Sequence, residues 1–337
     1  MNEASAPLIS VVIPTFNRLP RLKQVLGALS NQSLGNALFE VVVVSDGSTD
    51  GTKEYLSGYT ARPLVYAHQE NAGPGAARNR GVHLARGRLI LFIDDDIVAT
   101  PTLVERHLAA HGESATTVVI GPMLDAPGFR YSPWVAWEQA MLYKQYRAMR
   151  ESVFAPTFRQ FYTGNASVAR PLFLGAGGFN ASFRRAEDIE LAYRLDQLGA
   201  TFVFDETAIA HHFAERSFAS WIAAADAYGR NDVTFAREHE QHWLLPVMAS
   251  EFKQRSVVTQ LLVRSCLTRP RLGALASLLM QTIGGAPRMI PKVSSVALSG
   301  LFALTYYSAA AKEYGDGAAF RCTLCATADH DDEGLTG

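Results

Sequence analysis

The chain has few cysteines. Its 337 residues include only Cys266, Cys322 and Cys325, and these cannot form the disulfide framework typical of small secreted proteins. Cys322 and Cys325 have the spacing of a metal or redox pair, but a structural zinc site needs four ligands and the sequence has no second pair. The first ten residues lack the basic segment of a signal peptide. We therefore expect a protein of the reducing cytoplasm.

The chain also lacks a strong net charge. Its 31 Lys and Arg residues nearly balance its 32 Asp and Glu residues, which gives a formal net charge of −1. This balance argues against a general nucleic-acid-binding protein.

Acidic residues are missing from one long stretch. Between Phe252 and Lys312 the sequence has no Asp or Glu, whereas eight basic residues alternate with apolar ones: Lys253, Arg255, Arg264, Arg269, Arg271, Arg288, Lys292 and Lys312. This pattern fits either a helical subdomain packed on the rest of the protein or a basic amphipathic surface that docks on anionic lipid. Residues 293–311 have the length of a membrane span, but their Ser, Thr, Tyr and Gly residues weaken that interpretation.

Apolar spacing in the first hundred residues predicts alternating strands and helices. Short β-branched runs indicate strands, and apolar repeats at i, i+3, i+4 and i+7 indicate helices. Strands are expected at 8–13, 40–44, 64–67 and 89–93, and helices near 22–29, 52–56 and 76–85. This order predicts an α/β fold, a mainly parallel sheet with helices on both faces.

Polar residues follow three of these strands directly. Pro14 and Thr15 end the first strand, Asp46 ends the second, and Asp94, Asp95 and Asp96 end the strand 89–93. In such sheets ligands bind beyond the carboxyl ends of the strands. Three adjacent carboxylates repel one another, and the cost falls if a divalent cation and its ligand are their partners.

Five segments together resemble glycosyltransferase family 2. They are Val11-Val12-Ile13-Pro14-Thr15-Phe16-Asn17-Arg18, the turn 45–52 (Ser-Asp-Gly-Ser-Thr-Asp-Gly-Thr), residues 71–81 (Asn-Ala-Gly-Pro-Gly-Ala-Ala-Arg-Asn-Arg-Gly), Asp94-Asp95-Asp96 and Glu187-Asp188-Ile189-Glu190-Leu191. The resemblance covers roughly residues 8–215. It implies the GT-A (Rossmann-like) fold and an inverting, nucleotide-sugar-dependent transferase.

The resemblance implies a nucleotide site on the first part of the chain. Asp46 matches the aspartate that hydrogen-bonds the base, usually uracil, and Ser45 stands where a second aspartate is common. Asp94 matches a ribose or sugar contact, and Arg78 matches the basic residue that faces the phosphates and carboxylates. The full nucleotide-binding set is Pro14, Thr15, Asn17, Asp46, Arg78, Asp94 and Asp95.

The resemblance also implies the catalytic and metal residues. Asp188 matches the general base, and Glu187 is expected to orient the site. Asp96, with Asp94, matches the ligands of a divalent metal, Mn²⁺ or Mg²⁺. His211 and His212 stand where related enzymes often have a histidine that contacts metal or diphosphate, and the sequence does not decide between them.

The acceptor side is expected in the middle of the chain. An aromatic, amphipathic helix at 132–150 fits either core packing or one wall of an acceptor pocket. We assign Trp134, Trp137, Asn165, Gly177 and Gly178 to the acceptor side.

These observations predict three regions. Residues 1–215 form the GT-A catalytic domain, with an acceptor-side insertion at about 125–165. Residues 216–315 form a basic helical region that is a candidate for membrane association, and residues 316–337 form a polar tail.

The predicted function is transfer of a sugar, with a UDP-sugar favoured, to an acceptor hydroxyl by metal-dependent inverting displacement. The setting is bacterial-type cell-surface polysaccharide or glycolipid synthesis, with a glycan or lipid-linked acceptor and a peripheral position on the inner face of the plasma membrane. Alternatives are a nucleotidyltransferase or hydrolase of related fold, or a non-catalytic membrane-associated module that binds nucleotide-sugars. An oxidoreductase is excluded, because the turn after the first strand is not a Gly-x-Gly-x-x-Gly turn.

Overall fold

The computed structural model describes residues 6–35, 37–180, 183, 187–238, 242–267, 269–284 and 291–325. The chain divides into two compact units. The first unit consists of Met1–Arg130 and Gln139–Ala214, and the second consists of Tyr131–Glu138 and Glu215–Gly337. The sequence did not indicate that the short segment Tyr131–Glu138 belongs with the C-terminal helices.

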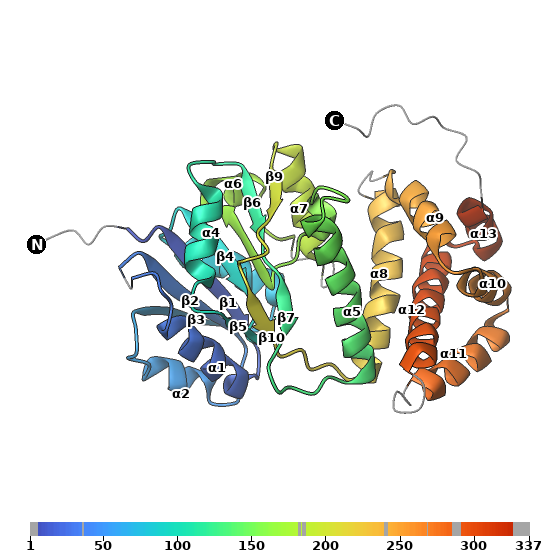
Figure 1. Cartoon of the computed structure of the whole chain (residues 1–337), viewed down its shortest axis with the longest axis horizontal. Helices are drawn as coiled ribbons and strands as arrows, with labels where there is room; N and C mark the ends of the chain where they lie inside the picture. The colour runs from blue at the N-terminus through green and yellow to red at the C-terminus, as the bar shows by residue number, and fades with distance from the viewer. Residues whose placement is uncertain are drawn as a thin grey trace, which may run out of the picture. The chain divides into compact units, whose positions relative to one another are not determined.

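A seven-stranded sheet forms the centre of the first unit (Figure 1). Its strand order is β3-β2-β1-β4-β8-β6-β9. All neighbouring strands pair in parallel except β8, which is antiparallel to both β4 and β6. The predicted α/β fold with a mainly parallel sheet is therefore confirmed. The strands are β1 (Ile9–Thr15), β2 (Phe39–Asp46), β3 (Leu64–Gln69), β4 (Leu89–Ile93), β6 (Thr117–Ile120), β8 (Asn165–Ala169) and β9 (Thr201–Phe204).

The first strand is longer than the sequence predicted. Pro14 was expected to end it, but β1 continues to Thr15, and Pro14 pairs with Val44 of β2. Pro14 lies past Val12, the last residue of β1 that pairs with β4. Its missing N–H therefore removes no hydrogen bond from that ladder.

Helices cover both faces of the sheet because alternate strand residues point to opposite sides. Val11 and Val41 pack in one core with Leu22 and Leu26 of α1, whereas Val12 packs in a second core. The second core also contains Val82 of α3, Phe173 of α6 and Leu191 of α7. The helices of this unit are α1 (Leu19–Ser30), α2 (Thr52–Ser57), α3 (Pro74–Leu84), α4 (Leu103–His111), the C-terminal part of α5 (Pro133–Arg150), the 3₁₀ helix η1 (Phe158–Gln160), α6 (Arg170–Gly175) and α7 (Glu187–Gln197).

A small second sheet lies just beyond the acidic run. It has the order β5-β10-β7, with β5 at Ile97–Ala99, β10 at Ala210–His212 and β7 at Met123–Asp125. Strand β10 is antiparallel to β5 and parallel to β7. Since β5 follows Asp96 directly, this pairing brings the end of β10 to the acidic run.

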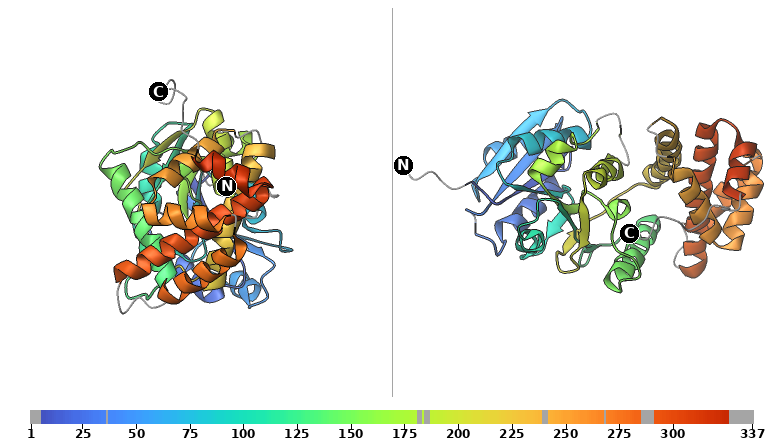
Figure 2. Two further views of the ribbon diagram at one scale, coloured as in Figure 1. Left: turned by 90° about the vertical axis from the view of Figure 1, so that its right-hand side faces the viewer. Right: turned by 90° about the horizontal axis from the view of Figure 1, so that it is seen from above.

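The second unit is helical, as predicted for residues 216–315. Its last helix, Gly317–Cys325, lies in the stretch 316–337 that the sequence predicted as a polar tail, because Phe320 and Leu324 pack in the core of this unit. It contains the first residues of α5 together with α8 (Phe218–Glu238), α9 (Leu244–Gln254), α10 (Val257–Cys266), α11 (Pro270–Gly284), α12 (Pro291–Tyr314) and α13 (Gly317–Cys325). Helix α12 packs against α8, α10, α11 and α13 (Figures 1 and 2). Its Tyr307 is fully buried and meets the ring of Phe252 at a centroid distance of 5.0 Å.

Helix α12 contains the stretch that the sequence raised as a possible membrane span. Among the described residues, Val293–Tyr314 is long and apolar enough to cross a membrane by length and composition. About half of its most apolar window, 56%, is buried inside the protein. The same composition therefore also fits the core helix of a helical bundle.

Candidate functional site

The acidic run lies between β4 and β5, and its three carboxylates have different partners. Asp94 accepts a hydrogen bond of 2.5 Å from Arg78 Nη2. Asp95 accepts from Thr15 Oγ1 at 2.8 Å. Burial, together with the neighbouring carboxylates, raises the pKa of Asp95 to about 6, although nearby Arg18 acts in the opposite direction.

Arg18 is the counter-charge of this run. Its Nη1 lies 2.6 Å from Asp96 Oδ2 and 3.3 Å from Asp95 Oδ1. Burial by itself would lower the pKa of Arg18, but the two carboxylates raise it. The first of the five sequence segments ends in Arg18, but no role was predicted for this residue. The available signal was a cation at the start of α1, three residues after Thr15.

Arg78 joins two segments that are far apart in the sequence. Its side chain is only 5% exposed and contacts both Asp94 and Glu187, the latter at 3.3 Å. Burial would lower the pKa of Arg78, but Asp94 and Glu187 raise it. A buried charge of this kind depends on its partners. The contact brings the N-terminus of α7 to the end of β4, so the expected catalytic segment and the expected nucleotide site meet.

Asp188 lies in the first turn of α7. One of its carboxylate oxygens accepts from the N–H of Ile189 at 2.9 Å. Burial raises the pKa of Asp188 to about 7, with a further contribution from the neighbouring Glu187 carboxylate. A carboxylate that titrates near neutral pH is suited to general-base catalysis.

Asp46 is buried at the end of β2, and its carboxylate has three protein donors. Gln69 Nε2 donates at 2.7 Å, and the N–H groups of Ala72 and Gly73 donate at 2.9 Å. Since a carboxylate offers about four acceptor positions, about one remains for a ligand. The carboxylate thus holds the turn that leads into α3, and its contact with a nucleobase stays a prediction.

Asn17 connects the turns after β1 and β2. It has a positive φ of 53°, a conformation that Asn tolerates better than most residues. Its Oδ1 accepts from the N–H of Thr49 at 2.8 Å, and its N–H donates to Ser48 Oγ at 3.0 Å. Asn17 therefore fixes the loop that carries Arg18, and its contact with a nucleotide stays a prediction.

The structure separates the two histidines of β10. His212 Nε2 lies 3.6 Å from Asp96 Oδ1. His211 Nδ1 instead lies 2.9 Å from the carbonyl oxygen of Asp125. Because neighbouring strand residues point to opposite faces, only one of the pair can face Asp96. The geometry favours His212 over His211 as the histidine next to a metal.

The donor set near Asp96 fits a divalent cation that also binds phosphate. Within the described part of the chain, no three His, Cys, Asp or Glu side chains converge as a complete metal site. Mg²⁺ in phosphate-transfer sites commonly takes one or two carboxylates, with substrate oxygens and water completing its shell. Asp96 with His212 beside it meets that smaller requirement. Both Asp96 and Asp94 already have a guanidinium partner, Arg18 and Arg78 respectively.

The residues assigned to the acceptor side have structural contacts. Trp134 and Trp137 belong to the second unit, where their rings meet Phe218 and Trp221 edge to face. Asn165 is fully buried, and its Nδ2 donates to the carbonyl of Ala208 at 2.8 Å.

Two glycines of the acceptor set, Gly177 and Gly178, turn the chain with φ values of 80° and 69°. A Cβ on Gly178 would lie 2.6 Å from Asn79 Oδ1, so a side chain has no room there. For all five acceptor-side residues, a direct contact with the acceptor stays a prediction.

The family model described as glycosyl transferase family 2 matches residues 10–186. The chain belongs to glycosyl transferase family 2. The match covers the first four of the five sequence segments and ends just before the fifth, which contains Glu187 and Asp188.

Two groups of curated relatives are glycosyltransferases. A validoxylamine A glucosyltransferase of Streptomyces hygroscopicus subsp. jinggangensis is 36% identical over 220 residues, covering 57% of this chain and 52% of that protein. A pre-mycofactocin glycosyltransferase of Mycobacterium tuberculosis is 24% identical over 235 residues, covering 68% of this chain and 48% of that protein. The chain thus spans about half the length of these relatives.

Solved structures confirm the GT-A fold. A mannosyltransferase of Pyrobaculum calidifontis in complex with GDP-Man and Mn²⁺ has a TM-score of 0.59 at 18% identity, covering 92% of this chain and 87% of its own. S. aureus TarS 1-349 in complex with UDP-GlcNAc has a TM-score of 0.55 at 17% identity, covering 91% and 92%. At such low identity these matches establish the fold alone.

Proposed function

We propose that this family 2 member transfers a sugar from a nucleotide-sugar to an acceptor hydroxyl with inversion at the anomeric carbon. The contact of Arg78 with both Asp94 and Glu187 carries the proposal. It brings the segment with Asp188 to the carboxyl ends of the parallel strands, where Thr15 and Asp46 also lie. Donor groups and a candidate base thus share one edge of the sheet.

Asp188 is the proposed base. As the acceptor oxygen bonds to the anomeric carbon, Asp188 accepts the hydroxyl proton, and the nucleoside diphosphate leaves with the electrons of the broken bond. The raised pKa of Asp188 supports this role, because a base that titrates near pH 7 is both free to accept a proton and basic enough to do so. Arg78, through Glu187, holds the segment in position.

The donor is proposed to be a nucleotide-sugar with UDP favoured. Its support is Asp46, whose free acceptor position suits a ring N–H, and Thr15 at the neighbouring strand end. Structurally similar enzymes were solved with GDP-Man in one case and UDP-GlcNAc in the other, so the binding experiment below compares UDP carriers with GDP carriers.

We propose that Asp96 and His212 hold Mn²⁺ or Mg²⁺. The assignment is supported by the distance of 3.6 Å between Asp96 Oδ1 and His212 Nε2. The bound cation would offset negative charge on the leaving diphosphate. Arg18 balances the charge of Asp95 and Asp96.

The acceptor is proposed to be a glycan or lipid-linked hydroxyl in cell-surface polysaccharide or glycolipid synthesis, at the cytoplasmic face of an anionic membrane. Helix α11 supports this setting, because most of its residues are apolar and its outward leucines, Leu272, Leu275, Leu278 and Leu279, are 39–65% exposed. Val257, Val258 and Leu261 of α10 are also exposed.

The charges around these helices favour lipid over a second copy of the chain. Lys253 and Arg269 are exposed next to these helices, Arg271 is exposed in the first turn of α11, and the sequence there has no acidic residue. A symmetric dimer through this surface would place the same cations against one another. Arg255 and Arg264 lie over the rings of Tyr307 and Phe252 and so contribute to packing. The packing of α12 supports peripheral docking rather than a membrane span.

A nucleotide-sugar panel tests the proposed function. Thermal shift with UDP-, GDP- and dTDP-sugars, with and without Mn²⁺, is expected to show stabilisation that needs a matching base and is larger with metal, since binding to the native state stabilises it. Donor consumption with and without acceptor sugars then separates transfer from simple hydrolysis. Stabilisation by no nucleotide, or hydrolysis that no acceptor diverts, would contradict the proposal.

A further inference from the structure

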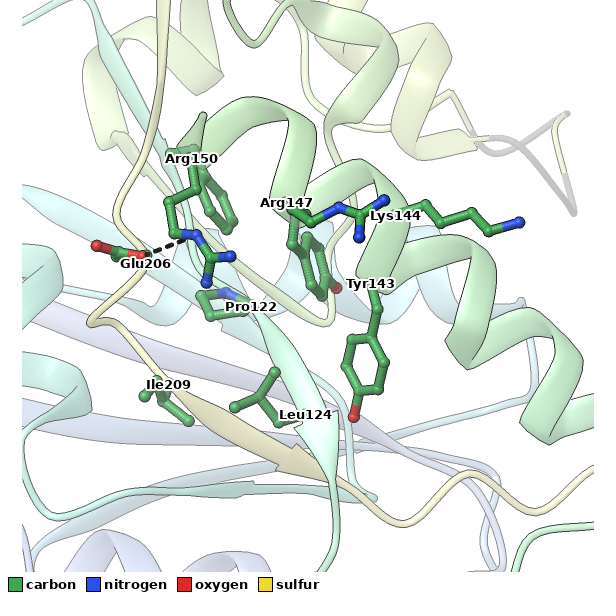
Figure 3. A pocket seen from close by; sticks show the side chains of 10 residues that line it. Pro122, Leu124, Tyr143, Lys144, Arg147, Arg150, Glu206 and Ile209 are labelled. Carbon is green, nitrogen blue, oxygen red and sulfur yellow. Dashed lines mark ion pairs between the residues drawn. The ribbon is translucent and has the colours of Figure 1, made fainter. Parts of the chain in front are cut away.

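A hollow of about 490 Å³ lies against the C-terminal half of α5 in the first unit (Figure 3). Its size is within the range of small-molecule sites. The start of β7, the loop after β9 and the residue before β10 form its other walls. The lining residues are Pro122, Leu124, Tyr143, Lys144, Tyr146, Arg147, Arg150, Phe204, Glu206 and Ile209.

Two tyrosines of α5 form a fixed wall of this pocket. The Tyr146 hydroxyl accepts from the N–H of Met123 at 3.2 Å, and the Tyr143 hydroxyl accepts from the N–H of Asp125 at 2.7 Å. The ring of Tyr146 also stacks on Phe204, with centroids 5.5 Å apart and planes 16° apart. Because both rings are tied to β7, the aromatic wall exists before any ligand binds.

The pocket also has an excess of positive charge, with three basic side chains and one acidic side chain in its lining. Lys144, Arg147 and Arg150 follow one another at a spacing of three on α5, which brings their side chains to one side of the helix. Arg150 Nε lies 3.9 Å from Glu206 Oε2, and both side chains are 55% exposed, so this pair is weak. Among the residues that the structure describes, neither Lys144 nor Arg147 has an acidic partner.

The helix dipole accounts for only part of this arrangement. Arg147 and Arg150 lie in the last turn of α5, where cations are favourable. The dipole does not explain Lys144, which lies before the last turn of α5, and it does not explain the hollow with its aromatic wall next to these cations.

The pocket is separate from the carboxylate site, although both use β7. The Met123 sulfur packs against Gly164, which itself lies beside Asp94. The next residue, Leu124, points to the opposite face of the strand and lines the pocket. Strand β10 contacts both the carboxylate site and β7, since His212 lies near Asp96 and His211 contacts the carbonyl of Asp125.

We propose that this pocket binds an anionic sugar, one that carries a phosphate or a carboxylate, and that this sugar is part of the acceptor. The guanidinium groups of Arg147 and Arg150 match the geometry of either anion, and Lys144 adds a third donor. The rings of Tyr143 and Tyr146 provide a flat surface for the sugar. Only the acceptor role rests on the proposed function, because binding by the pocket does not require transfer.

Binding to the full chain tests the proposal with four probes: glucose 6-phosphate, glucuronate, inorganic phosphate and glucose. Calorimetry is expected to show binding of glucose 6-phosphate, glucuronate or both, and much weaker binding of inorganic phosphate and of glucose. The first two probes distinguish a phosphate from a carboxylate ligand. Equal binding of inorganic phosphate and glucose 6-phosphate would overturn the sugar part of the proposal, and binding of neither anionic sugar would overturn it entirely.

Substitutions of the pocket residues test whether the anionic sugar binds there. Lys144→Gln with Arg147→Gln is expected to weaken anionic-sugar binding by about tenfold or more, since two charge-assisted contacts are lost. The matched control is Lys53→Gln with Arg88→Gln, two exposed cations elsewhere in the first unit, which should bind like the wild type. Tyr143→Leu should weaken the sugar phosphate more than inorganic phosphate. Equal affinities in the wild type and in the pocket variant would refute the assignment.

A measurement of nucleotide-sugar binding by the pocket variant distinguishes failure of this proposal from failure of the proposed function. The pocket variant should bind nucleotide-sugars as the wild type does, because its two substitutions are in α5, outside the carboxylate site. Loss of anionic-sugar binding with intact nucleotide binding supports the pocket. Equal loss of both would contradict a separate site.

Discussion

Arg18 Nη1 lies 2.6 Å from Asp96 Oδ2, at the junction between the acidic run and the start of α1. The contact places a positive charge on the carboxylate that the sequence assigned to a metal. Asp95 shares the same guanidinium, so Arg18 relieves the repulsion between two adjacent buried carboxylates. A metal that binds Asp96 must therefore compete with Arg18 or share the carboxylate with it.

We expect Asp96→Asn to abolish most metal-dependent nucleotide binding and to keep the fold. The amide oxygen can still accept from Arg18, but it lacks the charge that a hard cation prefers. Nucleotide-sugar binding is measured by calorimetry with Mn²⁺ and with excess chelator. Glu113→Gln, a change at an exposed residue of the same unit, is the control. Full activity of Asp96→Asn, or of the wild type in chelator, would sink the metal assignment.

We expect Asp46→Ala to weaken the binding of UDP and of every UDP-sugar to the same degree, since the predicted contact is to the base. The same change leaves the N–H groups of Ala72 and Gly73 without their acceptor, so stability should also fall, by about 0.5–1.5 kcal/mol for each partly buried hydrogen bond lost. Gln69→Ala removes one donor and keeps the carboxylate, so it should bind UDP normally. A variant at Asp46 that binds free UDP normally but discriminates between sugars would contradict the role.

The buried pair His107 and His111 predicts an acid-sensitive fold. Burial lowers the pKa of each to about 4, compared with about 6.5 in an unfolded chain. Below pH 6.5 the unfolded chain binds protons that the folded chain does not, so stability falls as the pH drops from 6.5 towards 4. His107→Gln should reduce this slope and lower stability at pH 7, because His107 hydrogen-bonds Ser167 and Asn165. Melting curves at several pH values measure the slope, and identical slopes in the two proteins would count against the explanation.

The exposed leucines of α11 predict binding to anionic vesicles. The full chain should co-sediment with vesicles that contain phosphatidylglycerol, less so with pure phosphatidylcholine, and less as salt rises. Leu275→Asn with Leu278→Asn and Leu279→Asn should abolish binding, whereas Leu84→Asn with Leu198→Asn, at exposed leucines of the first unit, should not. Equal binding to both vesicle types would contradict the proposal. So would leucine-dependent self-association without lipid binding.

Much of the first unit could be predicted from the sequence, because its signals are local. The repeat of Leu22, Val25, Leu26 and Leu29 predicted the buried face of α1, and the apolar run 89–93 predicted β4 at its observed bounds. Asp46 and Asp94 could be named as candidate binding residues because the sequence places them directly after predicted strands.

The remaining features depend on contacts between distant segments. The pairing of Arg78 with Glu187 spans 109 residues, and that of Arg18 with Asp96 spans 78. No local pattern showed that Trp134 and Trp137 would pack in the second unit or that Asn165 would be fully buried. The cations of α5 were visible at a spacing of three, but the hollow beside them required the packing of β7 and β10.

Transfer by Asp188→Asn is the most direct test of the proposed function. The variant should bind the donor nearly as well as the wild type, because the predicted donor contacts are elsewhere, at Thr15, Asp46 and Asp96. Its transfer rate should fall by about 10²–10⁴-fold, the typical contribution of a general base. In the wild type, kcat/KM should rise with pH through about 7, as Asp188 loses its proton, and the product should have the inverted anomeric configuration. A variant that transfers within a few-fold of the wild-type rate, or a product that retains the donor's configuration, would contradict the account.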